Sequence, residues 1–166
     1  MYKNQYQFRQ AKKEEVHQMF HLILERMKWM EEKGIVQWII GEYEEIYPEA
    51  YYEEEREKGH LYVLQDIQTK EIVCGAVLLS EDSRWNDQKR AIYIHNFASQ
   101  IDAKGVGKIF IQYVEELAKE KNKEYVRLDC AKTNQALSSY YEKQGYISVG
   151  ECQEGMYQGI LREKKI

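Results

Sequence analysis

The sequence predicts an α/β (α+β) fold in which a mixed, mostly antiparallel central sheet is flanked by helices. Three β-rich runs follow one another between residues 60 and 99, joined by the short segment IQTK and by a polar loop, and they indicate an antiparallel meander. Residues 91–131 then read as strand, helix and strand, a crossover that favours a parallel pair, although a splayed pair fits as well. A chain of 166 residues suits one core, so we expect a single domain over residues 1–166.

The N-terminal part is expected to form one strand followed by helices. Residues 6–11 alternate as a strand does, and the next segment shows helical spacing until Gly34. Helical spacing then returns, is broken by Pro48 and resumes in an acidic run that ends at Gly59, which indicates two short helices around a kink. The apolar positions are Val16, Met19, Phe20, Ile23, Leu24 and Met27 in the first helix, and Trp38, Ile39, Tyr43 and Ile46 before the proline.

The C-terminal part is expected to contain the meander, the crossover and a final pair of strands. One apolar face marks the longest helix of this part, and Asn134 and Gly145 suit the two ends of the shorter one. The expected strands are 60–66, 71–80, 91–99, 124–131 and two within 146–165, and the expected helices are 105–121 and 134–145.

Composition excludes several classes of protein. The net charge is −4 with no run of Lys and Arg, which argues against a nucleic-acid partner. No window approaches 18 consecutive apolar residues and the first residues are polar, so we expect no membrane partner and a cytoplasmic location. The cysteines Cys74, Cys130 and Cys152 are odd in number and widely spaced, which favours free thiols in a reducing compartment; their spacing suggests no metal site.

A loop with two glycines, DAKGVGK, stands between a predicted strand and the longest C-terminal helix. The N–H groups at a helix N-terminus attract anions, and glycine lets a phosphate approach the backbone closely. A tight turn from strand to helix explains Gly105 and Gly107 equally well. The loop fits neither the dinucleotide fingerprint nor the P-loop, which need further glycines or a following Lys-Ser or Lys-Thr.

Two motifs resemble the GNAT superfamily of acetyl-CoA-dependent N-acetyltransferases. DAKGVG is similar to the pyrophosphate loop R/Q-x-x-G-x-G/A, and NQALSSYYEKQGY is similar to N-x-x-A-x-x-x-Y-E-K-x-G-F, with Leu137 and Tyr146 as variants. Earlier segments also look like the opening of bacterial members, so the resemblance covers essentially the whole chain. It implies a GNAT-like sheet with a splayed strand pair at the cofactor site, and acetyl-CoA as the cofactor.

The resemblance also assigns roles to individual residues. It implies that backbone N–H groups of the glycine loop hold the pyrophosphate, that the end of the 91–99 strand pairs with the pantetheine arm and polarises the acetyl carbonyl, and that the second motif supplies further cofactor contacts. Tyr141 stands where a phenol protonates the leaving thiolate; a core tyrosine with a hydrated hydroxyl is the alternative. The implied cofactor-binding residues are Lys104, Gly105, Val106, Gly107, Lys108, Phe97, Ala98, Ser99, Asn134 and Lys143.

The general base has two candidates. Asp129 lies where some family members carry a catalytic glutamate, but a carboxylate fixed by backbone N–H groups is an equal interpretation. His95, ahead of the carbonyl-binding segment, is the other, and a lone strand histidine is more often packed. The loop departs from the family pattern at Asp102, at Ala103 and in a shorter connection, which places a negative charge near the pyrophosphate that Lys104 and Lys108 partly offset.

The leading hypothesis is therefore an enzyme that moves an acetyl group from acetyl-CoA to a primary amine of a small molecule or peptide, by direct attack in a ternary complex. A catalytically silent acyl-CoA-binding or interaction domain of the same fold is the alternative, and a homodimer stays open. The acceptor region is expected to be aromatic and acidic, which suits a cationic amine, although solvated helix faces explain the acids better. Its aromatic residues are Trp29, Trp38, Tyr43, Tyr47 and Trp85.

Overall fold

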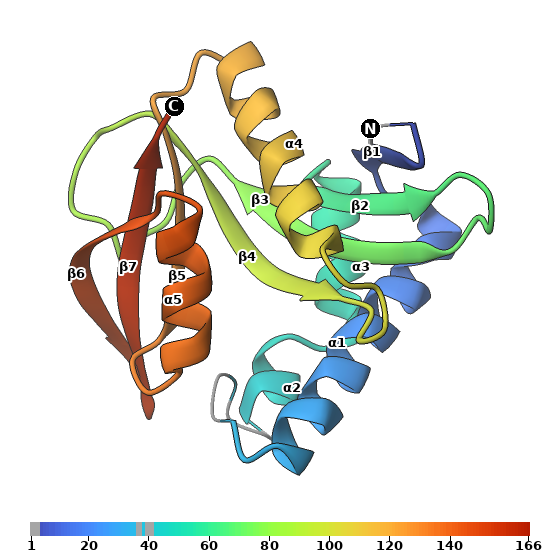
Figure 1. The fold of residues 1–166 in the computed structure, drawn as a ribbon, viewed down its shortest axis with the longest axis horizontal. Coiled ribbons are helices and arrows are strands. Elements are labelled where there is room, and N and C mark those ends of the chain that lie inside the picture. The colour runs from blue at the N-terminus through green and yellow to red at the C-terminus, as the bar shows by residue number, and fades with distance from the viewer. Residues whose placement is uncertain (1–3, 36–37, 39–41) are drawn as a thin grey trace.

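The computed structural model describes residues 4–35, 38 and 42–166, which form one seven-stranded sheet with helices on both faces (Figure 1). The strand order is β1-β2-β3-β4-β5-β7-β6, and only the β4–β5 pair is parallel, which confirms the predicted mixed sheet. The strands are β1 (Tyr6–Gln10), β2 (Leu61–Asp66), β3 (Ile72–Leu79), β4 (Ala91–Ser99), β5 (Tyr125–Ala131), β6 (Ile147–Glu154) and β7 (Tyr157–Lys165). The helices are the 3₁₀ turn η1 (Lys13–Glu15), α1 (Val16–Glu32), α2 (Glu42–Ile46), α3 (Glu49–Glu57), α4 (Val106–Glu120) and α5 (Gln135–Lys143).

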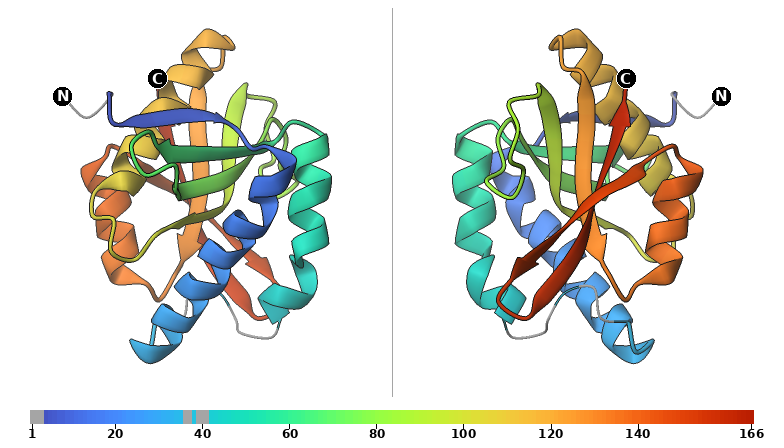
Figure 2. Two further views of the ribbon diagram at one scale, coloured as in Figure 1. Left: turned by 90° about the vertical axis from the view of Figure 1, so that its right-hand side faces the viewer. Right: turned by 90° about the vertical axis from the view of Figure 1, so that its left-hand side faces the viewer.

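The helices cover the sheet in two layers. Figure 2 shows α1 and α3 on one side of the sheet and α4 and α5 on the other. Each layer has its own core, because alternate residues of a strand point to opposite faces. Tyr62 and Leu64 of β2 pack toward α4, whereas Leu61 and Val63 pack toward α1.

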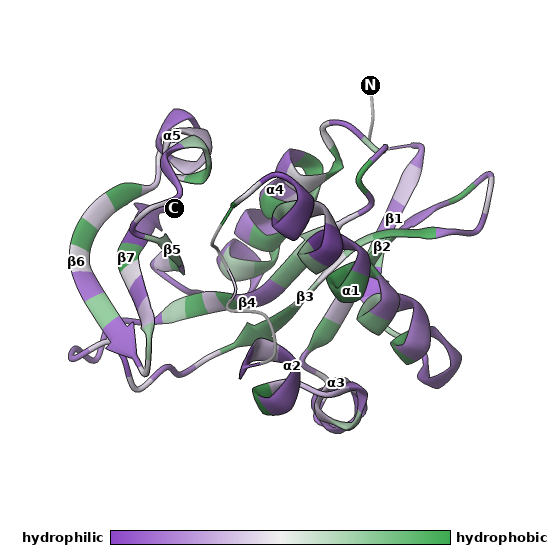
Figure 3. Cartoon of the chain, turned by 90° about the horizontal axis from the view of Figure 1, so that it is seen from below, coloured by the Kyte–Doolittle hydropathy of each residue, from purple (hydrophilic) through white to green (hydrophobic). Residues whose placement is uncertain are grey.

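Helices α1 and α4 bury the apolar faces that the sequence periodicity predicted, whereas α2 has no buried residue and its Ile46 is 56% exposed. In α4 the buried positions recur every three to four residues, as a helix on a sheet requires. Figure 3 shows β3 mostly hydrophobic between helices whose outer turns are hydrophilic. The buried residues of α4 are Val106, Phe110, Ile111, Val114 and Ala118, and those of α1 are Val16, Met19, Leu22, Ile23, Met27 and Met30.

The predicted elements are found within a few residues of their expected ends, including the break at Pro48 between α2 and α3. Trp38 lies in a bend rather than in a helix, and Ile39 lies outside the described residues. Cys74 and Cys130 are buried free thiols, as expected, while Cys152 is only partly buried. None of the described helices is long and apolar enough to cross a membrane.

Strand β4 carries a β-bulge at its centre. Gly75 pairs with Ala98 and Val77 with His95, so Ala76 alone faces two residues of β4, Asn96 and Phe97. Asn96 has a φ of 53°, in the left-handed region that asparagine tolerates better than most side chains. The bulge therefore turns the second half of β4 away from a regular ladder.

The amide of Asn96 is held from the helix side. Its Nδ2 donates to the Tyr43 hydroxyl at 2.6 Å, and its Oδ1 accepts from the Tyr51 hydroxyl at 2.9 Å. Tyr43 lies in α2 and Tyr51 in α3, so both short helices are tied to the bulge.

Strands β4 and β5 separate soon after they meet. Their parallel pairing is confined to residues 91–93 with 125–127, and Figure 1 shows the two strands diverging beyond this point. The sequence left a parallel pair and a splayed pair as alternatives; the structure combines them. This divergence opens the sheet between two helix N-termini, those of α4 and α5.

Candidate functional site

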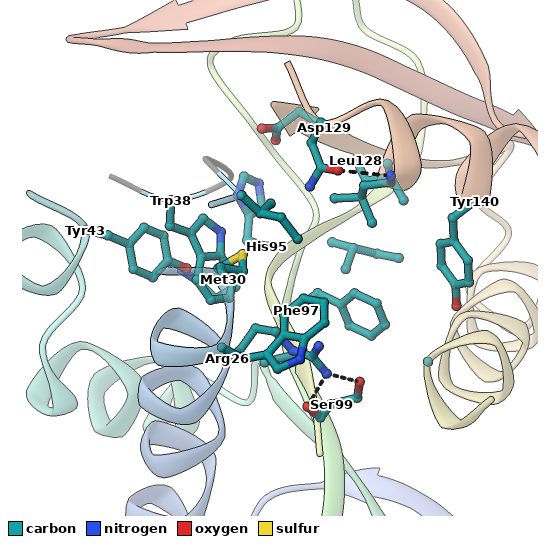
Figure 4. A pocket seen from close by; sticks show the side chains of 18 of the residues that line it. Arg26, Met30, Trp38, Tyr43, His95, Phe97, Ser99, Leu128, Asp129 and Tyr140 are labelled. Atoms are coloured by element: carbon teal, nitrogen blue, oxygen red, sulfur yellow. Dashed lines mark hydrogen bonds between the residues drawn. The ribbon is translucent and has the colours of Figure 1, made fainter. Parts of the chain in front are cut away.

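A pocket of about 520 Å³ occupies the opening between β4 and β5 (Figure 4). Its lining comes from both helix layers and from the second halves of the two strands, so it runs from the N-terminus of α4 to the region of α2. Of the predicted site residues, the pocket brings together His95, Phe97, Ala98, Ser99, Lys104, Gly105, Gly107, Asp129, Asn134 and Tyr141.

One end of the pocket is the N-terminus of α4. Ala103, Lys104, Gly105 and Gly107 line it, and the dipole and free N–H groups of the first turn make it suited to an anion. Lys104 is exposed and adds a positive charge. Val106 and Lys108, also predicted at this end, are not part of the lining: Val106 is buried in the core and Lys108 is exposed. The donor set therefore fits a pyrophosphate group.

The two loop glycines serve different purposes. Gly105 is the N-cap of α4 with a φ of 82°, a conformation that favours glycine, and a Cβ there would meet nothing within 4 Å. Gly107 has no such conformation, but a Cβ would lie 3.1 Å from the Tyr140 hydroxyl and 3.3 Å from Cζ of Phe97. The turn interpretation thus applies to Gly105, and Gly107 makes room for two rings that line the pocket.

The end of β4 forms one wall of the pocket. Phe97, Ala98 and Ser99 follow the bulge, as the family resemblance led us to expect of a segment that pairs with a pantetheine arm. Arg26 of α1 donates to the Ser99 carbonyl at 2.8 Å and to its hydroxyl at 3.1 Å, as drawn in Figure 4. Because its guanidinium also lies over the Trp29 ring, at 5.0 Å from the centroid, Arg26 fixes this strand end against α1.

Helix α5 supplies the opposite wall. The Asn134 side chain accepts a hydrogen bond from the Leu137 N–H at 3.1 Å and so caps the helix, as its position predicted. Tyr141 is buried, and this burial, with the nearby Tyr140, Cys130 and Asp129 groups, raises the pKa of its phenol well above the ordinary value. A phenol in that state keeps its proton and can donate it. Lys143 is exposed in the last turn and lies outside the lining.

His95 is held in a charged network beside the pocket. Its Nε2 lies 3.0 Å from Asp82 Oδ2, and its Nδ1 lies 3.1 Å from Nη2 of Arg84. In the neutral tautomer that donates to Asp82, Nδ1 accepts from Arg84, so both ring nitrogens are engaged. Burial favours the neutral acid, yet hydrogen bonds from His95 and Arg84 hold the pKa of Asp82 well below its usual range.

Among the described residues, Asp129 is held by two side chains, whereas the alternative interpretation required backbone N–H groups. Its Oδ1 lies 3.0 Å from Nη1 of Arg84, and its Oδ2 accepts from the Tyr157 hydroxyl at 2.6 Å. The carboxylate is 14% exposed and faces the pocket. Arg84 therefore joins Asp82, Asp129 and His95 into one network, which contains both predicted base candidates, Asp129 and His95.

The loop between β3 and β4, which carries Asp82 and Arg84, is anchored by Arg127 of β5. Arg127 is 1% exposed and donates to both carboxylate oxygens of Asp87, at 2.7 and 2.8 Å, and to Glu163 at 2.9 Å. Its guanidinium lies 4.3 Å from the centroid of the Trp85 ring. Trp85, expected at the acceptor rim, therefore lies on the anchor and is absent from the described lining.

The far end of the pocket is aromatic and acidic, as expected. Trp38 and Tyr43 stack with ring centroids 4.6 Å apart, and Tyr47 packs against Tyr43 at 4.9 Å. Glu42 and Glu154 line the same region. Asp102, by contrast, is exposed and does not belong to the lining, so its charge faces solvent.

Several site residues were not predicted from the sequence. Arg84 and Asp82 lie in a polar loop that has no motif, and Tyr157 lies in an ordinary strand. The motif YYEK holds two tyrosines, and only Tyr141 was singled out. The unpredicted residues are Arg26, Asp82, Arg84, Tyr140 and Tyr157.

Comparison with known sequences finds a family and a curated relative. The sequence model of the acetyltransferase (GNAT) family matches residues 23–146. The relative, an uncharacterized N-acetyltransferase YesJ from Bacillus subtilis (strain 168), is 29% identical over 119 residues, which cover 66% of this chain. The matched region spans 63% of that relative, less than two thirds of its length.

Solved structures share the fold over nearly the whole chain. A GNAT-family acetyltransferase from Listeria monocytogenes 4b F2365 has a TM-score of 0.79 at 20% identity, covering 97% of this chain and 95% of that one. One from Streptococcus agalactiae 2603 has a TM-score of 0.80 at 20% identity, with the same coverage. The PaiA N-acetyltransferase from Thermoplasma acidophilum, solved in complex with coenzyme A, has a TM-score of 0.72 at 18% identity, covering 97% and 99%.

Proposed function

Because the chain belongs to the acetyltransferase (GNAT) family, we propose that it transfers an acetyl group from acetyl-CoA to a primary amine of a small molecule or a peptide. The amine attacks the thioester directly while both substrates are bound. The observation that carries this proposal is one continuous pocket, which joins the α4 N-terminus to Tyr141 and Asp129 through the gap between β4 and β5. Acetyl-CoA held along β4 would thus meet an amine entering from the α2 side.

The cofactor supplies an activated acyl group, and the protein's own groups position the cofactor and polarise the acetyl carbonyl. The first turn of α4 and Lys104 face the end suited to the pyrophosphate. Strand β4 pairs with β5 at residues 91–93, before the bulge, so backbone N–H groups later in β4 would face a thioester carbonyl held in the gap; such donors at a developing oxyanion are worth on the order of 10²- to 10³-fold in rate. Tyr141 is the proton donor for the leaving thiolate.

The ring contacts of His95 favour Asp129 as the final proton acceptor. His95 has both nitrogens engaged by Asp82 and Arg84, so its role is to hold these two charges in place. Asp129 lies in the lining, and its carboxylate is positioned there by Arg84, whose Nη1 lies 3.0 Å from Oδ1. No cysteine lies among the described lining residues, which supports direct attack over a covalent enzyme intermediate.

The silent-domain alternative depended on Asp102, and the exposure of this residue outside the lining removes that support. Calorimetry with acetyl-CoA on wild type, Gly107→Glu and Asn134→Ala tests the cofactor site. Gln112→Glu is the matched control, because it adds the same charge on the exposed face of the same helix.

We expect micromolar binding by wild type and Gln112→Glu, and a loss of roughly 100-fold or more in Gly107→Glu, where the new carboxylate meets Phe97 and Tyr140 and repels the pyrophosphate. An amine panel followed by mass spectrometry then tests transfer. A folded wild type that binds no acetyl-CoA would overturn the cofactor site. Tight binding with no acetylated amine would establish the silent domain instead.

A further inference from the structure

The attacking amine must lose a proton, and the contacts of Asp129 define the route. This inference rests on the proposed acetyl transfer. Each carboxylate oxygen of Asp129 already faces a donor, Arg84 at Oδ1 and Tyr157 at Oδ2. An amine that approached the carboxylate directly would have to compete with one of these hydrogen bonds.

Tyr157 places a second proton-carrying group beside Asp129 in the pocket lining. It begins β7 next to the acceptor end and belongs to the pocket lining. Its hydroxyl donates to Asp129 Oδ2 at 2.6 Å, a short bond typical of a phenol with an ionised acceptor. Because the proton points at the carboxylate, the acceptor lone pairs of the phenol oxygen point elsewhere.

The ring of Tyr157 is seated so that this hydrogen bond keeps its geometry. A Cβ at Gly159 would lie 2.8 Å from the ring and 2.9 Å from the hydroxyl oxygen, so the ring packs directly on the backbone of its own strand. Arg84 holds Asp129 from the other side and is itself fixed by Asp82. Donor and acceptor are therefore both positioned before any substrate arrives.

We propose that Tyr157 is a catalytic residue that relays the amine proton to Asp129. As the N–C bond to the acetyl carbon forms and the C–S bond breaks, the amine proton passes to the Tyr157 oxygen and the phenol proton passes to Asp129. Tyr141 donates its proton to the thiolate. Asp129 then releases its proton to water in the pocket and Tyr141 recovers one from water, so the charges balance over the cycle.

The raised pKa of Tyr157 agrees with this assignment. Burial and the charge of Asp129 raise the pKa of the Tyr157 phenol far above its usual value, so the phenol is protonated at neutral pH and transfers its proton only as it receives another. Tyr141 and Tyr157 thus work at separate ends of the reaction, one as acid and one as relay.

Tyr157→Phe tests the relay by removing one oxygen and keeping the ring. Tyr62→Phe is the control, because it removes the hydroxyl of a buried tyrosine of β2 that lies outside the pocket lining. Single-turnover acetylation of an amine from the panel is measured in mixtures of H₂O and D₂O. Thermal unfolding and acetyl-CoA calorimetry check that each variant folds and binds the donor.

We expect Tyr157→Phe to bind acetyl-CoA within about twofold of wild type and to lose roughly 10²- to 10³-fold in the transfer rate. A relay moves two protons in one step, so the wild-type rate should curve with deuterium fraction more strongly than that of Tyr157→Phe. Asp129→Asn, which leaves the phenol in place, should show a loss of similar size even if Tyr157→Phe folds poorly.

A Tyr157→Phe rate within threefold of wild type would overturn the relay. A large loss with unchanged curvature would also overturn it, since Tyr157 would then only position Asp129. Failure of the proposed function is a separate result, in which wild type itself acetylates no amine although it binds acetyl-CoA.

Discussion

Replacing Arg127 with Met should destabilise the protein strongly and also lower the transfer rate, although Arg127 lies outside the pocket lining. The guanidinium is buried, and its charge is balanced by Glu163 and by Asp87 of the β3–β4 loop. Methionine fills part of the space but leaves Glu163, whose side chain is 9% exposed, without its main counter-ion. Among the described residues, Lys89 is the cation that remains near that carboxylate, at 3.8 Å.

The size of the destabilisation follows from removing one partner of the buried Arg127–Glu163 pair and leaving the other. Breaking a buried pair by removing one partner typically costs about 3 to 5 kcal/mol, because the remaining charge stays buried and uncompensated. Asp87 adds little, since its side chain is 37% exposed and water replaces the lost partner. A double variant that also changes Glu163 to Gln should recover roughly half of the loss, because the stranded charge is then gone.

Urea unfolding followed by circular dichroism measures the change. Arg90→Met is the matched control, since Arg90 pairs with Glu124 at 3.7 Å with both side chains largely exposed, and such pairs are worth about 0.2 to 1 kcal/mol. Arg127→Met should also lower the transfer rate, because the loop that carries Asp82 and Arg84 loses its anchor. A loss of stability below about 1 kcal/mol, equal to that of the control, would refute the reasoning.

Two further predictions concern Asp82 and Asn96. Folding lowers the pKa of Asp82, so the stability that this carboxylate contributes is present above its ordinary pKa of about 3.9 and is lost as the pH falls through the folded value. Below pH 4, the free energy of unfolding measured in urea should therefore decline more steeply for wild type than for Asp82→Asn. Parallel curves would contradict this. Asn96→Ala should lower the free energy of unfolding by about 2 to 4 kcal/mol, because alanine at a φ of 53° is strained and the Tyr43 and Tyr51 hydroxyls lose a partner. Asn96→Gly removes the backbone strain and should recover about 1 to 2 kcal/mol of this loss in thermal unfolding. Equal losses in the two variants would show that backbone strain is not involved.

The sequence alone determined most of the elements and, through the family resemblance, predicted the residues proposed for the cofactor end of the site. Helix faces and strands follow from periodicities within short stretches, which is why α4 and its buried face were found at their expected places. The glycine loop and the Asn134 to Tyr146 motif are also contiguous, so the α4 N-terminus, the α5 cap and the candidate Tyr141 could be predicted from local sequence.

Only the tertiary structure could bring together the residues of the proposed acceptor end. Tyr157 and Asp129 are 28 positions apart and Arg127 and Asp87 are 40 apart, and these side chains meet because β5 lies between β4 and β7. Strand order and register depend on which surfaces exclude the most water together, a property of the whole chain that no local pattern expresses. The bulge at Asn96 has the same origin, because its left-handed backbone is held by tyrosines of α2 and α3, 53 and 45 positions away.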